Sequence, residues 1–267
     1  MSNKVILEPV NGLMNRFRSI ASSKIFSEFT NREFLLNWKP TYDCNVNISD
    51  LVEDGFFNIG YDVDRFGCYY HSGYEKGSEQ PFIDEMISTD REIIYLIAGG
   101  NFIPTGMSIS DFNNKKSDFY KSIPFVDRIK NESNEFISKN SDYIGIHLRY
   151  TDRIEYSPNI EYVENIISNN DTNIFICSDD RSILNNLKSK FGDKILTYNI
   201  TNLNRSSVDG SQQSIIEWLL LANSKKIYYS TGSSYSYEAC IYNKISNSIE
   251  MNPNNIQLDD LKIKLEF

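Results

Sequence analysis

The sequence predicts an α/β protein with two domains, each built around an open parallel sheet. Short apolar runs alternate with segments whose apolar residues recur at helical spacing, and from residue 143 onward the alternation is unbroken. Parallel strands must be joined by crossovers, and this alternation of strands and helices supplies them. The chain has 267 residues, 40% of them hydrophobic, which is enough to bury one or two ordinary cores. We place the boundary between residues 113 and 142, which gives domains 1–130 and 131–267.

The N-terminal domain is expected to begin with a strand–helix–strand unit. The strands are KVILE at residues 4–8 and EFLLNW at residues 33–38, and the helix is expected over residues 16–30. Such a unit almost always has a right-handed crossover. Residues 41–77 show no clear period and are expected to form loops and short elements, whereas IIYLIA at residues 93–98 indicates another buried strand.

The C-terminal domain is expected to follow a polar region at residues 111–118 and an amphipathic helix over residues 125–139. Strands and helices then alternate regularly, and polar residues close most of the strands. The expected strands are 143–147, 173–177, 194–198, 226–230 and 246–250, and the expected helices are 159–169, 181–191, 212–222 and 234–242.

Composition excludes several classes of function. The formal net charge of -9 disfavours general binding to nucleic acids or anionic lipids, so a phosphate ligand needs a local cluster of Arg side chains and N–H groups. No run is long enough for a signal-peptide core or a membrane span, and we expect a cytoplasmic protein. The four cysteines lack C-x-x-C spacing, which argues against a disulfide framework. With two histidines in the chain, the composition argues against a His-based zinc site, and His147 is the candidate imidazole acid or base.

Four polar clusters lie where strands are expected to end, which is where ligands of open α/β sheets bind. They are NGLMNRFR at 11–18, HLRYTDR at 147–153, SDDR at 178–181 and STGSS at 230–234. An Arg149 that faces the Gly-Ser-Ser helix N-terminus can clamp a diphosphate, and the alternative is a surface ion pair between Arg149 and Asp152. The SDDR cluster is also explained by helix capping. In the STGSS cluster, capping and phosphate binding use the same groups.

In their order and spacing these motifs resemble the fucosyltransferase superfamily, which joins α-1,2-, α-1,6- and protein O-fucosyltransferases, including nodulation-type enzymes. The segments that carry the resemblance are GLMNR at 12–16, GIHLRYTD at 145–152, ICSDD at 176–180, IEWLLLA at 216–222 and STGSS at 230–234. The resemblance covers most of the chain and is most specific in residues 143–242.

The resemblance implies the GT-B fold, in which two Rossmann-like domains with parallel sheets face each other across a cleft. Residues 1–130 would then form the acceptor side, and residues 131–267 would bind the GDP-sugar. The family inverts the anomeric centre of GDP-β-L-fucose with no cofactor and no essential metal. The absence of an anchor in the sequence favours a bacterial or viral type of enzyme, whose partners would be GDP-fucose and a glycan acceptor.

The resemblance also implies roles for single residues. Arg149 would hold the β-phosphate of the donor, and His147 would lie beside the guanosine. Glu217 stands where the family usually has an Asp that accepts from N1–H and the amine of guanine, and a carboxylate suits that pair of donors. The chain departs from the family pattern at Tyr150, where many members have a second Arg, and at Met14, which replaces a loop glycine. The other implied donor-binding residues are Asn15, Arg16, Ser178, Asp179, Thr231, Gly232, Ser233 and Ser234.

The implied reaction is an in-line displacement at C1 of fucose, in which GDP leaves while an acceptor hydroxyl attacks from the opposite face. Arg149 would stabilise the charge on the diphosphate, and Asn15 would line the site near the transferred sugar. Asp152 and Glu155 are the candidates for a general base. Two other functions stay open: a GT-B transferase of another nucleotide sugar, and a non-catalytic nucleotide- or glycan-binding protein. Glu217 favours guanine over uracil, and Arg149 with Asp152 favours catalysis.

Overall fold

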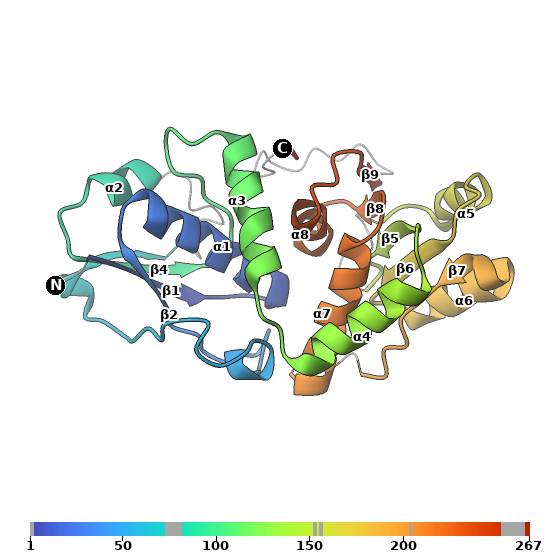
Figure 1. Cartoon of the computed structure of the whole chain (residues 1–267), viewed down its shortest axis with the longest axis horizontal. Helices are drawn as coiled ribbons and strands as arrows, with labels where there is room; N and C mark the ends of the chain where they lie inside the picture. Colours follow the sequence, from blue (N-terminus) through green and yellow to red (C-terminus); the bar gives the residue numbers. More distant parts are fainter. Residues whose placement is uncertain are drawn as a thin grey trace. The chain divides into compact units, whose positions relative to one another are not determined.

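The computed structural model describes residues 3–72, 82–151, 154, 157–202, 204, 206–251 and 265–267. The chain divides into two compact units, one of Met1–Val126 with Asn204–Ser211 and Ile263–Phe267, the other of Asp127–Leu203 with Gln212–Lys262. Each unit contains one sheet with parallel strand pairs and helices packed on it (Figure 1). Within the described residues, no helix combines the length and the apolar character that a membrane crossing requires.

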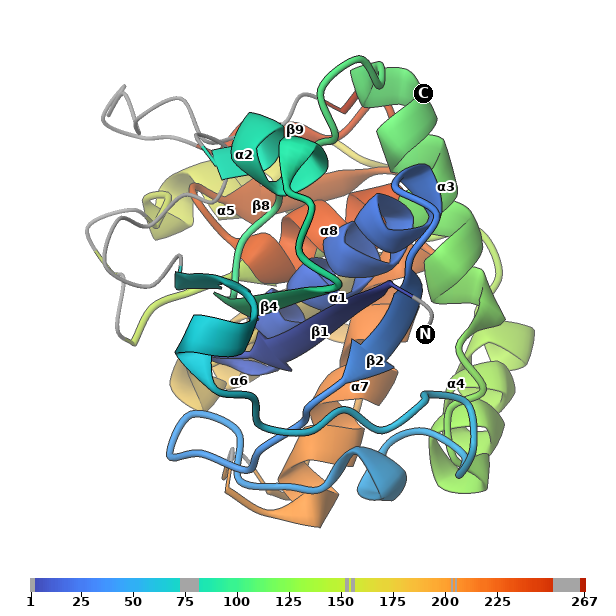
Figure 2. The same ribbon diagram turned by 90° about the vertical axis from the view of Figure 1, so that its left-hand side faces the viewer.

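The first unit has a four-stranded sheet in the order β2-β1-β4-β3. Figure 2 shows β2, β1 and β4 side by side. The strands are β1 (Lys4–Pro9), β2 (Glu33–Leu36), β3 (Tyr69–Ser72) and β4 (Ile93–Ala98), the helices are α1 (Leu13–Phe29), α2 (Ile83–Ser88) and α3 (Ile109–Ser122), and short 3-10 turns lie at Ile48–Asp50 and Arg65–Gly67.

The sheet of the first unit is buried on both faces, because β1 alternates between two apolar clusters. Val5 and Leu7 belong to the larger cluster, which takes side chains from all three helices. Ile6 belongs to a smaller cluster on the opposite face, together with Tyr95 of β4 and Cys68. Since side chains alternate along a strand, an almost continuous apolar run such as KVIL is what burial on both faces requires.

The second unit has a five-stranded sheet in the order β7-β6-β5-β8-β9. The strands are β5 (Ile144–Leu148), β6 (Ile174–Ser178), β7 (Ile195–Leu196), β8 (Ile227–Ser230) and β9 (Ile249–Met251), and the helices are α4 (Asp127–Lys139), α5 (Ile160–Ser168), α6 (Arg181–Phe191), α7 (Val208–Ala222) and α8 (Ser234–Tyr242), with a 3-10 turn at Gly192–Lys194.

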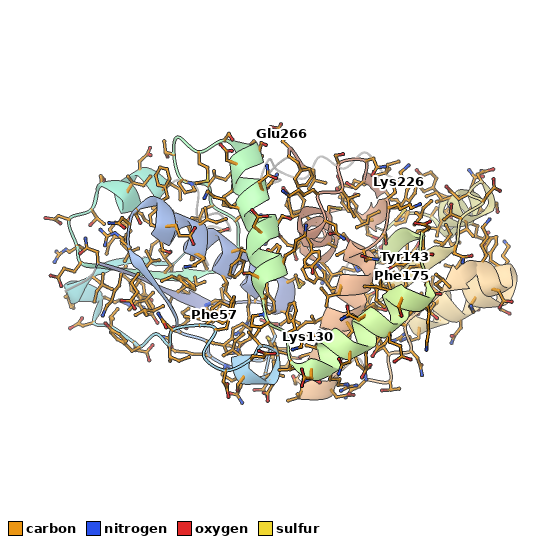
Figure 3. All side chains as sticks on the ribbon, viewed as in Figure 1. Phe57, Lys130, Tyr143, Phe175, Lys226 and Glu266 are labelled. Carbon is orange, nitrogen blue, oxygen red and sulfur yellow. The ribbon has the colours of Figure 1, made fainter. Side chains whose placement is uncertain are left out.

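Helices cover both faces of the second sheet. Isoleucines of β5 and β6 pack with the apolar side chains of α5 and α6 on one face. On the other face lie Tyr143 and Phe175, which are labelled in Figure 3. The ring of Phe136 in α4 packs against both, with centroids 6.3 and 5.5 Å apart. Helix α7 and the turn after it approach the same face closely, because a Cβ placed on Gly145 of β5 would lie 2.7 Å from Cδ1 of Leu221 in α7 and 2.5 Å from the hydroxyl oxygen of Ser224 in the turn. Glycine at this position lets both side chains pack directly on β5.

The predicted alternation of strands and helices is confirmed, and the main error concerns α3. The sequence suggested only a polar region there, yet α3 runs for 14 residues. Ser108 caps it by accepting a hydrogen bond from the Asp111 N–H, at 3.0 Å. Three residues spaced by four, Phe112, Lys116 and Tyr120, form its buried stripe. Because one of them is a lysine, the stripe does not read as apolar in the sequence.

A second difference concerns the start of α1. The helix begins at Leu13, with Gly12 as its N-cap, and not at residue 16. Asn15 therefore lies inside the helix, where the sequence suggested a loop, and Arg16 lies in its first turn and not at its first position.

Candidate functional site

The carboxyl ends of β5, β6 and β8 meet at one edge of the second sheet. In the register of the sheet, Leu148 pairs with Ser178, and His147 pairs with both Cys177 and Tyr229. Three of the four polar clusters, those after β5, β6 and β8, are therefore brought together within this unit. The fourth cluster, residues 11–18, belongs to the first unit and is described separately below.

The backbone of Arg149 is fixed by its neighbours at this edge. Its N–H donates to the Ser230 hydroxyl at 3.2 Å, and its carbonyl accepts a hydrogen bond from the Ser157 hydroxyl. The carboxylate of Asp179 accepts from the Tyr150 N–H at 2.8 Å and from the Thr151 hydroxyl at 2.6 Å. These bonds tie the segment after β5 to both adjacent strands, so Arg149 starts from a fixed main chain, and Asp179 acts on this segment directly.

His147 is buried and held on two sides. Its Nδ1 lies 2.6 Å from the Ser236 hydroxyl and 3.3 Å from the Ser233 hydroxyl, and its ring stacks on Tyr235 with centroids 5.0 Å apart. Burial, followed by the positive charge of Arg149, lowers the pKa of His147 to about 3. A neutral imidazole with so low a pKa is a weak base at pH 7, so this geometry favours a structural or ligand-contacting role over the acid or base role expected from composition.

The turn between β8 and α8 combines capping with an anion contact. The Ser233 side chain caps α8 by accepting from a backbone N–H of its first turn, and Ser234 is the first residue of the helix. Gly232 has a φ of 72°, and its N–H donates to a carboxylate oxygen of Glu250 at 3.1 Å. The Thr231 hydroxyl is buried and donates to the backbone of β9 at 3.3 Å. A negatively charged oxygen is thus already bound at this helix N-terminus, as the dipole of α8 favours.

Residues after β6 follow the capping interpretation. The Asp180 side chain caps α6 by accepting from the Ser182 N–H at 2.8 Å, and the Ser178 hydroxyl accepts from the Asp180 N–H at 3.1 Å. Ser178 itself is buried. These two residues therefore shape the loop between β6 and α6.

Glu217 of α7 is a buried carboxyl group with an oxygen that has no partner. The residue is 7% exposed, and its Oε1 makes no hydrogen bond within the described residues. Burial raises the pKa of Glu217 to about 8, and the positive charge of Arg181 opposes this rise. Cys177 and Tyr235 lie near enough for Glu217 to raise their pKa values further, after burial itself. Because an unpaired buried carboxyl group destabilises a fold, its presence points to a ligand that completes its hydrogen bonds.

Two residues beside Glu217 hold the loop after β7. The side-chain amide of Gln213 accepts from the N–H groups of Thr201 and Asn202, and Nη2 of Arg181 donates to the Ile200 carbonyl. Sequence reasoning assigned no role to Gln213. The one signal was its position four residues before Glu217 on an expected helix, which places both side chains on one face.

In the first unit, Arg16 forms hydrogen bonds to neighbouring groups of the protein. The residue is fully buried. Its guanidinium donates to the carbonyls of Asn11 and Lys39, at 2.9 and 2.8 Å, and to the Thr41 hydroxyl, at 2.5 Å. The guanidinium also lies 4.7 Å from the centre of the Trp38 ring. The sequence suggested a direct ligand contact for Arg16. In this geometry it instead fastens the segment after β2 to the start of α1.

Asn15 is half-buried, and its side-chain oxygen accepts from Nη2 of Arg18 at 2.8 Å. The same nitrogen of Arg18 donates to the Gly99 carbonyl at the end of β4, at 3.0 Å. Asn15 is thereby oriented at the carboxyl edge of the first sheet. Two further predicted residues, Asp152 and Glu155, lie outside the described residues. Within the described part of the chain, no three His, Cys, Asp or Glu side chains converge as metal ligands would.

Comparison with known proteins gives a likeness of fold. No family model matches the chain, and no curated protein matches it. Among solved structures, NodZ α-1,6-fucosyltransferase soaked with GDP-fucose is similar to it over 98% of this chain and 100% of that chain, with a TM-score of 0.67 and 14% identity. A variant of FUT1 from Arabidopsis thaliana in complex with GDP matches over 96% of this chain and 72% of its own, with a TM-score of 0.66 and 16% identity.

POFUT1 in complex with GDP-fucose is also similar, over 96% of this chain and 99% of that chain, with a TM-score of 0.57 and 10% identity. At these identities the likeness is one of fold. The fold expected from the sequence motifs, that of the fucosyltransferase superfamily, is therefore confirmed.

Proposed function

We propose that this protein transfers L-fucose from GDP-β-L-fucose to a hydroxyl group of a glycan acceptor, with inversion at C1 and without a required metal. The observation that carries the proposal is the buried Glu217 carboxyl group, whose free oxygen lies in the unit that would bind the donor. Guanine offers two adjacent donors, N1–H and the exocyclic amine, and a carboxylate is the side chain that accepts from both. Uracil has no such pair of donors.

The fold supports this proposal. NodZ, Arabidopsis FUT1 and POFUT1 share it, and their solved structures contain GDP or GDP-fucose. In open α/β sheets, ligands bind beyond the carboxyl ends of the strands. Glu217 would therefore recognise the base in a fold where a nucleotide site is expected. The second unit, Asp127–Leu203 with Gln212–Lys262, would form the donor-binding side.

We assign the diphosphate to Arg149 and the first turn of α8. When the bond between C1 of fucose and the β-phosphate oxygen breaks, that oxygen takes up the bonding electron pair, and negative charge grows on GDP. The guanidinium and the N–H groups of a helix N-terminus stabilise such charge without moving, a role that a metal ion has in other enzymes. The contacts of Ser230, Ser157 and Asp179 around Arg149 and its neighbours support this assignment, because they set the backbone in advance.

The acceptor oxygen forms the new bond to C1 from the opposite face and loses its proton to a base. Asp152 and Glu155 stay the predicted candidates for that base, and Asn15 stays the predicted contact near the sugar. Arg16 would act indirectly, by holding the backbone at the start of α1 in place. The neutral His147, stacked on Tyr235, would line the nucleoside side and not take the proton.

Calorimetric titration with GDP tests the proposal, with UDP as the competing ligand and EDTA in every buffer. We expect micromolar binding of GDP, much weaker binding of UDP, and loss of GDP binding in Arg149→Ala. Release of GDP from GDP-fucose, measured with and without a panel of glycans, then tests for transfer. Equal affinity for UDP would keep a nucleotide-sugar transferase and discard guanine. Tight GDP binding with no release of GDP from GDP-fucose under any condition would leave a non-catalytic nucleotide-binding protein.

A further inference from the structure

The loop after β7 is attached to α7 one turn before Glu217. The Gln213 side-chain oxygen accepts from the Thr201 N–H at 2.8 Å and from the Asn202 N–H at 3.2 Å, and its Nε2 donates to the Thr201 hydroxyl at 2.9 Å. Gln213 is 3% exposed, whereas Thr201 is exposed and Asn202 half-buried, so a buried side chain holds a loop at the surface. One buried side chain therefore fixes the backbone of a segment that belongs to no helix or strand.

A second attachment comes from α6. Nη2 of Arg181 donates to the Ile200 carbonyl at 3.1 Å. The same side chain carries the charge that acts on Glu217, where it opposes the effect of burial. Arg181 thus links the loop to the neighbourhood of the buried carboxyl group.

These contacts attach residues 200–202 to two helices: Gln213 holds them to α7, and Arg181 holds them to α6. Because Gln213 and Glu217 are four residues apart in one helix, their side chains lie on the same face. One oxygen of Glu217 has no hydrogen-bond partner among the described residues. A loop that is held from two sides is ordered before a ligand reaches that carboxyl group.

We propose that Gln213 is a positioning residue for nucleobase recognition, which holds the backbone of residues 200–202 beside the carboxyl group that reads guanine. The inference rests on the proposed function. A loop that is ordered before the ligand arrives loses little conformational entropy when the base binds. Without Gln213 the loop must become ordered on binding, and we expect the affinity for GDP to fall roughly tenfold, a typical effect of losing such preorganisation.

The test compares Gln213→Ala with Gln212→Ala, which removes the same side chain one position earlier. The Gln212 side-chain oxygen accepts a hydrogen bond from Nη1 of Arg128 in α4, at 3.3 Å. Dissociation constants for GDP and UDP, the KM and kcat for GDP release from GDP-fucose, and thermal stability are measured for each. Gln213→Ala should raise the Kd for GDP and the KM about tenfold, with little change in kcat or in the Kd for UDP. Gln212→Ala should change none of these constants.

Thr201→Val removes only one of the three bonds, so it keeps the inference testable if Gln213→Ala does not fold. We expect a smaller loss of the preference for GDP over UDP, in the same direction. An unchanged preference in either folded variant, even with lowered thermal stability, would show that the attachment is merely structural and would overturn the inference. If the wild-type protein shows no preference for GDP, the proposed function fails and the inference fails with it. If the wild-type protein prefers GDP and the variants show the same preference, the inference fails and the proposed function stands.

Discussion

At the residue scale, the chemistry of Glu217 depends on its protonation. Its pKa of about 8 means that the carboxyl group of the ligand-free protein carries a proton at neutral pH. Guanine presents two donors to it, and only the ionised form accepts from both. The proton must therefore leave when GDP binds below pH 8, and binding should be linked to proton release.

The first prediction follows from this linkage. The affinity for GDP should rise with pH by up to about tenfold per unit until the pH reaches the pKa of Glu217, and then level off. Calorimetry in buffers of different ionisation enthalpy measures the released proton. UDP carries the same diphosphate, so the protons released when UDP binds give the contribution of the diphosphate, which is subtracted. Glu217→Gln should bind GDP weakly and without the extra proton, whereas a wild-type protein that releases no more protons with GDP than with UDP would contradict this prediction.

A second prediction at this scale concerns Glu250, whose carboxylate occupies the Gly232 N–H at the start of α8. A diphosphate bound there would compete for that N–H and would be repelled by the carboxylate. Glu250→Gln should therefore strengthen GDP binding several-fold, about 0.5–1.5 kcal/mol, the usual net value of one hydrogen bond. Asp193→Asn, at an exposed carboxylate in the 3-10 turn after α6, is the matched control and should have no effect. Weaker binding in Glu250→Gln would mean that Glu250 supports the turn and does not compete with the ligand.

Arg16 shows where residue-scale sequence reasoning stops. An Arg that follows a glycine-containing turn at a strand end is predicted to bind phosphate. Nothing in the local sequence distinguishes that role from a buried arginine that bonds to the protein itself. The distinction depends on the carbonyl of Lys39 and the hydroxyl of Thr41, which lie 23 and 25 residues away. Only tertiary structure brings them to the guanidinium. Glu217, in contrast, belongs to a local motif with a specific chemistry, and its role in reading guanine stays a prediction.

At the element scale, the position of α7 decides the site, because this helix carries both Glu217 and Gln213. Its distance from the sheet is set at Gly145, where an added Cβ would lie 2.5 Å from Ser224 Oγ and 2.7 Å from Leu221 Cδ1. Contacts this short cannot persist, so a methyl group at this position must displace the side chains of Ser224 and Leu221 or shift α7 away from β5.

The third prediction is that Gly145→Ala destabilises the protein by about 1–3 kcal/mol, the usual cost of overpacking a core, and also weakens GDP binding. Urea unfolding and GDP titration of the same preparation measure both effects. Gly67→Ala is the matched control, because nothing lies within 4 Å of an added Cβ there. A variant that loses stability but binds GDP as tightly as the wild type would show that the site does not depend on the spacing of α7.

The elements also show why sequence periodicity succeeds in one unit and falls short in the other. In the second unit, strands rich in isoleucine alternate with helices, and α6 and α8 match their expected bounds residue for residue. In the first unit, α3 buries Lys116, which donates to Asn101 at 2.7 Å and lies over the rings of Phe112 and Tyr120. A lysine accommodated in this way follows from its surroundings, and hydrophobic spacing does not reveal it.

At the scale of the whole molecule, the net charge of -9 and the proposed anionic ligand are in apparent conflict. The second unit resolves this conflict because the groups assigned to the diphosphate are a guanidinium and a helix N-terminus, both of which attract negative charge. The carboxyl group in the proposed site is assigned to the base and not to the phosphates. The sequence could predict this arrangement of strand ends, since parallel strands bring their carboxyl ends to one edge. It could predict the local capping bonds of Ser178 and Ser233, whose donors lie two and three residues further along the chain. It could not predict the bond from the Tyr150 N–H to Asp179, because that donor is 29 residues away and follows another strand.

The last prediction tests the assignment of the donor to one unit. Amide hydrogen exchange measured by mass spectrometry should show that GDP slows exchange in peptides covering 145–151, 198–202 and 230–238, because ligand binding stabilises the segments that it contacts against local opening. Peptides covering β1 and β4 should be unaffected by GDP, since the groups assigned to the base and the diphosphate all lie in the second unit. Arg149→Ala with the same GDP concentration is the control for ligand-independent changes. Protection confined to residues 4–9 and 93–98 would place the nucleotide on the other sheet and reverse the assignment, because both sheets have parallel strands whose carboxyl ends could receive it.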